Sequence, residues 1–289
     1  MEVINANRHQ RPATVSAGDW NPAFADRHPA FAQLGAVRFW EHCSTWPDCT
    51  LLGGRLPPGL QVCSGALVRF VPQDGTLPYP ALYYEERIAR HGLVATRANW
   101  HDFFNALVWG LYPAAKVRIN TLHGRDIETA GMARTARRDA LTLFDENGVV
   151  LVGSDRALLQ AVLDFRWVEV FDPGAGWGTS LVCQVFGHAL FEKLMTPYVG
   201  LTAHAILLQA DAAFFELSLP RQQEWISHGL ATVLEHIDAP DRLSPVPVLG
   251  IPGWWPVQND DFFSNRAYFR SKQRTRRAKA YPLPPKGER

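Results

Sequence analysis

The segment 140–155, ALTLFDENGVVLVGSD, is the stretch that indicates the fold most directly. Two apolar runs flank Asp145-Glu146-Asn147-Gly148, and an Asn-Gly pair between apolar runs is a strong signal for a β-hairpin. We therefore expect two antiparallel strands here, with the two carboxylates serving the turn. Helical patterns surround this segment without strict alternation. The sequence thus predicts an α+β fold, a single globular domain whose central, hairpin-containing sheet is packed by helices.

The length and composition of the chain are those of a globular protein with one large core. Of its 289 residues, 47% are hydrophobic and 20% are charged, which excludes a disordered or fibrous class. A single core can extend over a chain of this length, and no linker marks a second domain. We therefore expect a flexible N-terminal arm (1–20), one α+β domain (21–271) and a basic, disordered tail (272–289).

The positive charge of the chain is concentrated in its last part. The segment 266–289 carries nine Lys/Arg and one Glu, whereas the whole chain has a formal net charge of only +1. Such a basic tail is either a nucleic-acid contact or a solvated end that aids solubility. Neither a signal peptide nor a run of about 18 apolar residues is visible, so we expect no membrane partner and a cytoplasmic location.

The segment 97–113, RANWHDFFNALVWGLYP, predicts an amphipathic helix that carries polar groups among aromatic rings. Asn99 is a suitable N-cap, and Pro113 ends the helix. His101 and Asn105 then lie one turn apart on the same face. An imidazole and an amide in an aromatic setting are more typical of a pocket than of a solvated surface.

A second helix is expected directly after Pro113, with Lys116, Asn120 and His123 on one of its faces. Because the connection is short, the two helices should run antiparallel and bring their polar faces together. Asp102 adds a carboxylate to this cluster, although a carboxylate in a first turn can simply complement the helix dipole. Such a cluster can bind a metal, shuttle a proton or hold an anion.

Two further groups of residues have spacings that suit ligand binding. His188 and Glu192 in FGHALFEK (186–193) are four residues apart, which suits two metal ligands on one helix face or a surface ion pair. Arg137 and Arg138 precede the predicted hairpin, where guanidinium groups can grip a phosphate or a carboxylate. The sequence contains no G-x-S-x-G, Walker loop or G-x-G-x-x-G, and therefore favours neither a serine nucleophile nor a nucleotide cofactor.

Several of these motifs also resemble a known family. The chain contains, in order, TRANWHDFFNALVW, RRDALTLFDENGVVL, FGHALFEK, GLTAHAILL and PVLGIPGW. Together they are similar to a family of uncharacterised bacterial proteins catalogued as domain of unknown function 3025. The resemblance extends from about Leu51 to Phe269 and implies that the residues beyond Ser271 are an extension. It implies no activity, so no catalytic residue is carried over from it.

Three functions are compatible with these residues. The first is a metal-assisted hydrolase that acts on an anionic or nucleic-acid-derived substrate and uses a divalent metal as cofactor. Its catalytic residues are His101, Asp102, Asn105 and His123, its substrate-binding residues Lys116, Asn120, Arg137 and Arg138, and its metal ligands His188 and Glu192. The second is a nucleic-acid or ribonucleoprotein binding protein that uses the tail and residues 134–138 without catalysis. The third is a metal-free binder of a small ligand, in which the same cluster recognises a carboxylate.

Overall fold

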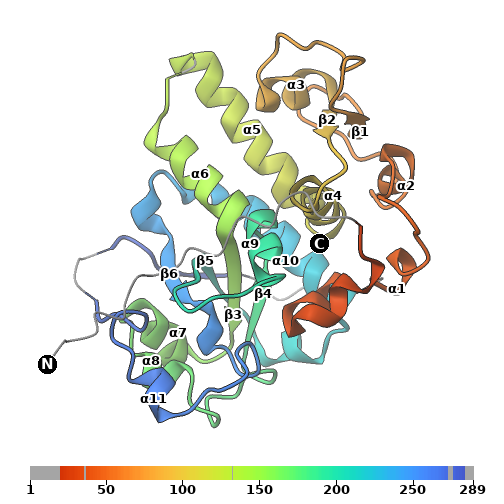
Figure 1. Cartoon of the computed structure of the whole chain (residues 1–289). Coiled ribbons are helices and arrows are strands. Elements are labelled where there is room, and N and C mark those ends of the chain that lie inside the picture. Colours follow the sequence, from red (N-terminus) through yellow and green to blue (C-terminus); the bar gives the residue numbers. More distant parts are fainter. Residues whose placement is uncertain (1–19, 36, 132, 273–275, 284–289) are drawn as a thin grey trace, which may run out of the picture.

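A five-stranded mixed sheet lies at the centre of the computed structural model, which describes residues 20–35, 37–131, 133–272 and 276–283 (Figure 1). Its strands are β3 (Gly148–Gly153), β4 (Leu181–Val185), β5 (Thr202–Gln209), β6 (Ser244–Pro247) and β7 (Ala280–Pro282). The order is β4-β3-β5-β6, and β7 pairs with the part of β5 that β6 leaves free. Strand β5 is parallel to β3 and β7, whereas β4 and β6 are antiparallel to their neighbours.

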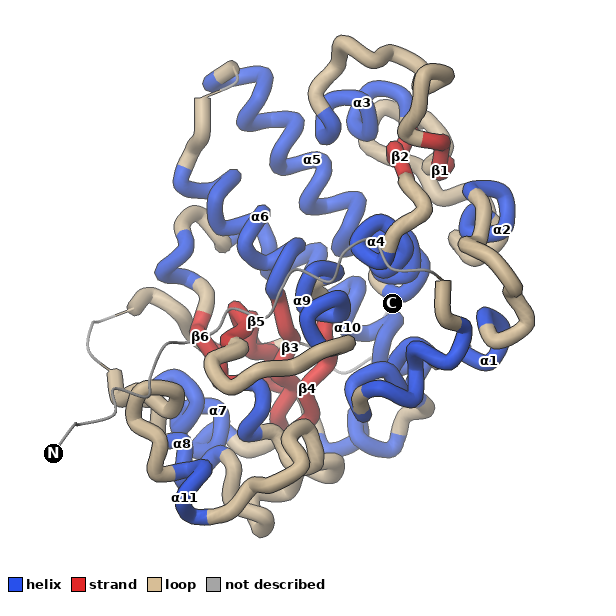
Figure 2. Tube along the Cα trace, viewed as in Figure 1, coloured by secondary structure: helices blue, strands red, loops and turns tan. Residues whose placement is uncertain are grey.

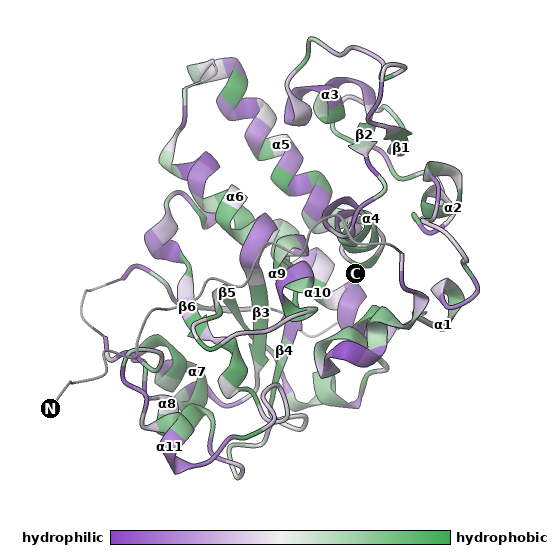
Figure 3. Ribbon diagram, in the orientation of Figure 1, coloured by the Kyte–Doolittle hydropathy of each residue, from purple (hydrophilic) through white to green (hydrophobic). Residues whose placement is uncertain are grey.

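The middle of this sheet is buried on both faces. Every residue of β3 is buried, and so are the four successive residues 205–208 of β5. Figure 3 shows β3 as a continuous apolar strand. Parallel strands of this kind need helices on both faces, because neither face can be left to water. The strands therefore form the centre of the core, and the helices carry the polar groups around it.

Helices make up most of the rest of the molecule (Figure 2). The longer ones are α4 (Trp100–Leu111), α5 (Pro113–Ala130), α6 (Ala136–Asn147), α7 (Arg156–Leu163), α9 (His188–Leu194) and α10 (Leu219–Val233). Two short ones are α8 (Trp167–Val170) and α11 (Asp260–Phe263). The 3-10 helices are η1 (Pro22–Arg27), η2 (Pro29–Leu34), η3 (Ala212–Glu216), η4 (Leu234–His236), η5 (Pro240–Arg242) and η6 (Val248–Gly250).

A smaller lobe lies beside the long helices at the upper right of Figure 1. It contains the parallel pair β1 (Arg69–Pro72) and β2 (Leu93–Thr96), together with α2 (Cys49–Gly53) and α3 (Tyr84–His91). The short helix α1 (Val37–Trp40) precedes it in the chain. Helix α3 packs against α5 and thereby brings side chains of this lobe to the centre of the molecule.

The α+β class predicted from the sequence is confirmed, and so are the two consecutive helices around Pro113. The side chain of Asn99 accepts a 2.8 Å hydrogen bond from the backbone of Asp102 and caps α4, and Pro113 is the first residue of α5. The expected antiparallel arrangement is wrong, because Figure 1 shows α4 end-on while α5 lies across the view. The buried residue Tyr112, whose backbone is not helical, turns the chain between them.

The predicted β-hairpin at residues 140–155 is also wrong. Residues up to Asn147 belong to α6, which Thr135 caps, and Gly148 begins β3, whose antiparallel partner is β4. A Cβ on Gly148 would lie 2.2 Å from the carbonyl oxygen of Phe144. The Asn-Gly pair therefore marks a close passage at the end of a helix, where only glycine fits, and not a tight turn.

The two chain ends differ in how far the structure describes them. The arm predicted for residues 1–20 lies outside the described residues except for Trp20. The tail predicted to be disordered supplies β7, whose Tyr281 is buried, and Arg277 pairs with Asp238 at 3.1 Å and with Asp241 at 2.9 Å. An apolar ring and these ion pairs attach that part of the tail to the body. Among the described residues, no helix combines the length and the apolar character that crossing a membrane requires.

Candidate metal centre

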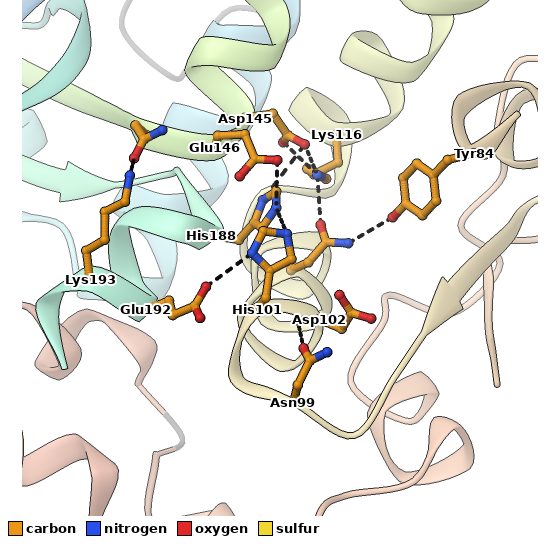
Figure 4. Close-up of polar contacts among 12 residues, drawn as sticks. Tyr84, Asn99, His101, Asp102, Lys116, Asp145, Glu146, His188, Glu192 and Lys193 are labelled. Atoms are coloured by element: carbon orange, nitrogen blue, oxygen red, sulfur yellow. Dashed lines mark hydrogen bonds and ion pairs between the residues drawn. The ribbon is translucent and has the colours of Figure 1, made fainter. Parts of the chain in front are cut away.

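Two histidine rings meet where the first turn of α4 reaches the start of α9 (Figure 4). The Nε2 atoms of His101 and His188 are 3.1 Å apart, and the interplanar angle between the rings is 80°. Phe104, three residues after His101, stacks on Phe191 of α9 with ring centroids 5.5 Å apart. This apolar contact holds the two helices against each other and so brings the two imidazoles together.

Glu146, in the last turn of α6, completes this group. Its Oε1 lies 3.6 Å from Nε2 of His188, and one ligand atom each of His101, Glu146 and His188 lies within 4.8 Å of the others. Gly187 permits this approach, because a Cβ there would lie 2.5 Å from the carbonyl oxygen of Glu146. These three residues, called the triad below, offer two imidazole nitrogens and one carboxylate, a frequent ligand set for divalent metals.

The triad is only partly buried. The side chain of His188 is 6% exposed, whereas those of His101 and Glu146 are 34% and 35% exposed. Catalytic metal sites keep a position open for water or substrate, whereas structural sites are closed by protein ligands. The exposure of the triad therefore resembles that of a catalytic site.

A carboxylate faces the Nδ1 atom of each histidine in the triad. Oε2 of Glu192 lies 3.2 Å from Nδ1 of His101, and Oδ2 of Asp145 lies 3.9 Å from Nδ1 of His188. The hydrogen bond with Glu192 raises the pKa of His101, although partial burial acts in the opposite direction. Carboxylates in these positions favour a proton on Nδ1 and leave Nε2 free to bind a metal.

The neighbouring carboxyl groups of Asp145 and Glu146 are both stabilised as anions. Burial by itself raises the pKa of each group, yet in both cases interactions with neighbouring side chains outweigh it and the pKa is lowered. For Asp145 the main one is the attraction of the Lys116 ammonium, whose Nζ lies 2.6 and 2.8 Å from the two carboxylate oxygens. For Glu146 it is the hydrogen-bonding interaction with the ring of His188. Two negative charges therefore stand beside the histidine pair.

A buried polar network continues behind Asp145. The side chain of Lys116 is only 5% exposed, and its Nζ also donates to Oδ1 of Asn105 at 3.0 Å. Nδ2 of Asn105 donates in turn to the hydroxyl oxygen of Tyr84 at 2.9 Å. Burial raises the pKa of Tyr84 well above its ordinary value, so this phenol keeps its proton. The network joins α3, α4, α5 and α6 on the inner side of the triad.

The structure brings part of the sequence-predicted site together and leaves part of it elsewhere. The residues at the triad or in contact with its neighbours are His101, Asn105, Lys116, His188 and Glu192. Asp102 is held instead by Arg97, whose backbone nitrogen and Nε lie 2.7 and 2.9 Å from Oδ2. His123 is buried on α5, and its Nδ1 has no hydrogen-bond partner among the described residues.

The other residues predicted to hold an anion are bonded to other groups. Nδ2 of Asn120 donates to the backbone carbonyl and to Oε2 of Glu85, at 2.9 and 2.7 Å. Arg137 pairs with Asp126 at 3.4 Å, and Arg138, which is buried, donates to a backbone carbonyl at 2.8 Å. The hydrogen bonds of Asn120 and the charged groups of Arg137 and Arg138 thus serve the packing of α3, α5 and α6.

Sequence reasoning missed the two carboxylates that adjoin His188. Asp145 and Glu146 were assigned to a turn, because the Asn-Gly pair that follows them was taken as the centre of a hairpin. A helical signal was present in Leu141 and Phe144, which are three residues apart and both buried on α6. Reading that spacing as a helix would have placed both carboxylates in its last turn, at one end of β3.

The triad lies within a segment that defines a family. The family described as "Protein of unknown function (DUF3025)" matches residues 68–274, which is more than half of the chain. The chain therefore belongs to this family, as the motifs quoted from the sequence predicted. Searches among curated proteins and among solved structures found no significant match.

Proposed function

We propose that this member of the DUF3025 family is a metal-assisted hydrolase whose triad binds one divalent cation. The observation that supports this most strongly is the 3.1 Å distance between the Nε2 atoms of His101 and His188. The Nδ1 atom of each of these rings faces a carboxylate. With Nδ1 protonated on both rings, two nitrogen lone pairs would point at each other. A proton or a metal ion between them removes this repulsion, and the negative charge of Glu146 favours the divalent ion.

The chemistry follows from the partial exposure of the triad. Three protein ligands leave at least one coordination position for water, and a divalent cation makes such water acidic enough to attack at neutral pH. The same cation polarises a carbonyl or phosphoryl oxygen that reaches it. Glu192 orients His101 in this proposal, and Asn105 and Lys116 support the site from within.

The proposed class of substrate is based on the metal. A divalent cation binds carboxylate or phosphate oxygens directly, which is consistent with an anionic or nucleic-acid-derived substrate. Lys116, Asn120, Arg137 and Arg138 are bonded to protein groups and are therefore left out of the proposed substrate contacts. Arg277 of the basic tail is paired with Asp238 and Asp241, so no contact described above favours binding of nucleic acid without catalysis.

The test begins with the metal content of protein purified without a metal-affinity tag. We expect about one zinc or similar divalent ion per chain, and hydrolysis of a model ester or phosphodiester that stops with chelator and returns with added metal. H188A and E146Q should lose both the metal and the activity. H228A is the matched control, because His228 is exposed on α10 and should keep both.

Each alternative predicts a different result. A protein that takes up no zinc, manganese, cobalt or iron would contradict the proposal. Bound iron with oxygen consumption would replace hydrolysis by oxygen chemistry, which the same ligand set supports in other proteins. A metal-free binder of a small ligand would keep its thermal shift with a carboxylate metabolite in the presence of chelator.

A further inference from the structure

The ion pair of Lys116 and Asp145 lies behind His188, on the side of its ring that faces away from His101. Asp145 faces Nδ1 of His188, whereas His101 faces Nε2. The ammonium and the carboxylate are largely buried, with exposures of 5% and 15%. A buried ion pair adds little stability compared with apolar side chains of the same size, so its presence beside a candidate metal ligand suggests another role.

The Nδ1 atom of His188 lacks a hydrogen bond within the described residues. It is fully buried, and Oδ2 of Asp145 is 3.9 Å away. Buried polar atoms rarely stay without a partner, because the cost of desolvating them is then not recovered. A shift of the imidazole toward Asp145 by less than one bond length would satisfy this atom.

We propose that Asp145 is a positioning residue that accepts the Nδ1–H hydrogen bond of His188 when a cation binds at Nε2, and that Lys116 holds the carboxylate of Asp145 in place for this task. This inference rests on the metal centre of the proposed function. A metal ion needs the lone pair on Nε2, so the proton of the ring must be on Nδ1. Glu192 has the same relation to His101, at 3.2 Å. The two histidines are thus prepared in the same tautomer by two different carboxylates.

Lys116 acts only through Asp145 in this inference. Its Nζ contacts both carboxylate oxygens and is held in place by Oδ1 of Asn105. Without the ammonium, both carboxylate oxygens of Asp145 lose the charged hydrogen bonds that fix their orientation toward His188. Removing Lys116 should therefore have the same effect on the metal as replacing the carboxylate of Asp145.

The dissociation constant of Zn²⁺, measured by competition with a chromogenic chelator, tests this role. We expect D145N and K116M each to bind Zn²⁺ about 10–100 times more weakly than the wild type. The double variant K116M/D145N should bind no more weakly than D145N, because the two residues act in series. E85Q is the matched control. Glu85, on α3, accepts a hydrogen bond from Asn120, which lies one turn after Lys116 on α5. This bond does not involve Asp145 or His188, so E85Q should bind Zn²⁺ as tightly as the wild type.

A second measurement separates positioning from simple loss of structure. The visible spectrum of the Co²⁺-loaded protein reports the orientation of the ligands, and it should change in D145N but not in E85Q. The double variant leaves no unpaired buried charge, so it provides the affinity even where a single variant folds poorly.

The outcomes are distinct. Zn²⁺ affinity of D145N equal to that of the wild type, or a double variant whose loss is the product of the two single losses, would overturn the inference. A wild-type protein that binds Zn²⁺ and loses affinity as expected, yet hydrolyses nothing, would support the inference while the proposed function fails. A wild-type protein that binds no metal would overturn both.

Discussion

The N–H group of Gly187 donates a 2.8 Å hydrogen bond to the carbonyl oxygen of Gly148, where the end of α6 passes the start of α9. A Cβ on Gly187 would lie 2.4 Å from the nitrogen of Gly148 and 2.5 Å from the carbonyl oxygen of Glu146. Both contacts are with backbone, which cannot rotate away as a side chain can. The crossing therefore places Glu146 and His188 side by side, and it depends on the absence of side chains at both glycines.

The first prediction concerns this crossing. G187A should lower the free energy of unfolding by about 1–3 kcal/mol, because the added methyl group overpacks a backbone contact. It should also weaken Zn²⁺ binding, since Glu146 and His188 are pushed apart. Urea denaturation and chelator competition measure the two effects. G53A is the control, because a Cβ on Gly53 meets nothing within 4 Å. Equal stability and equal affinity of G187A and G53A would contradict the prediction.

The second prediction concerns pH. The hydrogen bond with Glu192 raises the pKa of His101, so this ring stays protonated to a higher pH than an ordinary histidine. An imidazolium cannot bind a metal, and therefore Zn²⁺ affinity should fall as the pH decreases. The fall should already begin above the ordinary histidine pKa of about 6.5. Dissociation constants measured from about pH 8 down to about pH 5.5 test this, and a constant value over that range would refute it.

The third prediction concerns the edge of the sheet. Nε2 of Gln33 donates to the carbonyl of Val185 at 2.7 Å, and Oε1 of Gln33 accepts from the N–H of Val185 at 2.8 Å. One side chain thus bonds the edge of β4, along which the described residues provide no further strand. Q33A should lower the free energy of unfolding by about 1–3 kcal/mol, because two backbone groups lose their partners. The exposed Gln160 offers a control, and Q33A as stable as Q160A would count against this account.

The fourth prediction concerns the C-terminal strand. Tyr281 of β7 is buried, but its hydroxyl has no hydrogen-bond partner within the described part of the chain. Y281F should therefore be at least as stable as the wild type, whereas Y281A should lose about 2–5 kcal/mol through the cavity that it leaves. Chemical denaturation distinguishes the two variants. If Y281A unfolds at the same denaturant concentration as the wild type, β7 contributes nothing to the stability of the body.

Local signals in the sequence were enough to predict elements, but not the contacts between them. Asn99 and Pro113 identified the ends of two helices correctly, because caps and prolines act within one turn. The pair Asn147-Gly148 misled the prediction, since the same dipeptide suits a hairpin turn and the end of a helix. The spacing of Leu141 and Phe144 favours the helix, but the packing of Phe144 against Gly148 decides between the two cases, and packing is a property of the folded chain.

The candidate site shows the same limit. His188 and Glu192 were recognised by their spacing, but the part of each residue depends on distant neighbours. Glu192 faces Nδ1 of His101, whereas Glu146 adjoins Nε2 of His188. No local sequence pattern shows that each histidine is paired with a carboxylate from another part of the chain. Arg137 was predicted to bind an anion because it lies beside another guanidinium group in the sequence. Its actual partner, Asp126, is brought to it only when α5 packs on α6.

The triad joins three helices that are far apart along the chain, α4, α6 and α9. An unfolded chain holds these ligands at no fixed distance, so a cation bound by all three favours the folded state by mass action. At a free concentration about 1,000 times its dissociation constant, such an ion adds about 4 kcal/mol to the free energy of unfolding. The supply of the ion would then determine the fraction of the protein that is folded as well as its chemistry, and metal depletion would make unfolding easier.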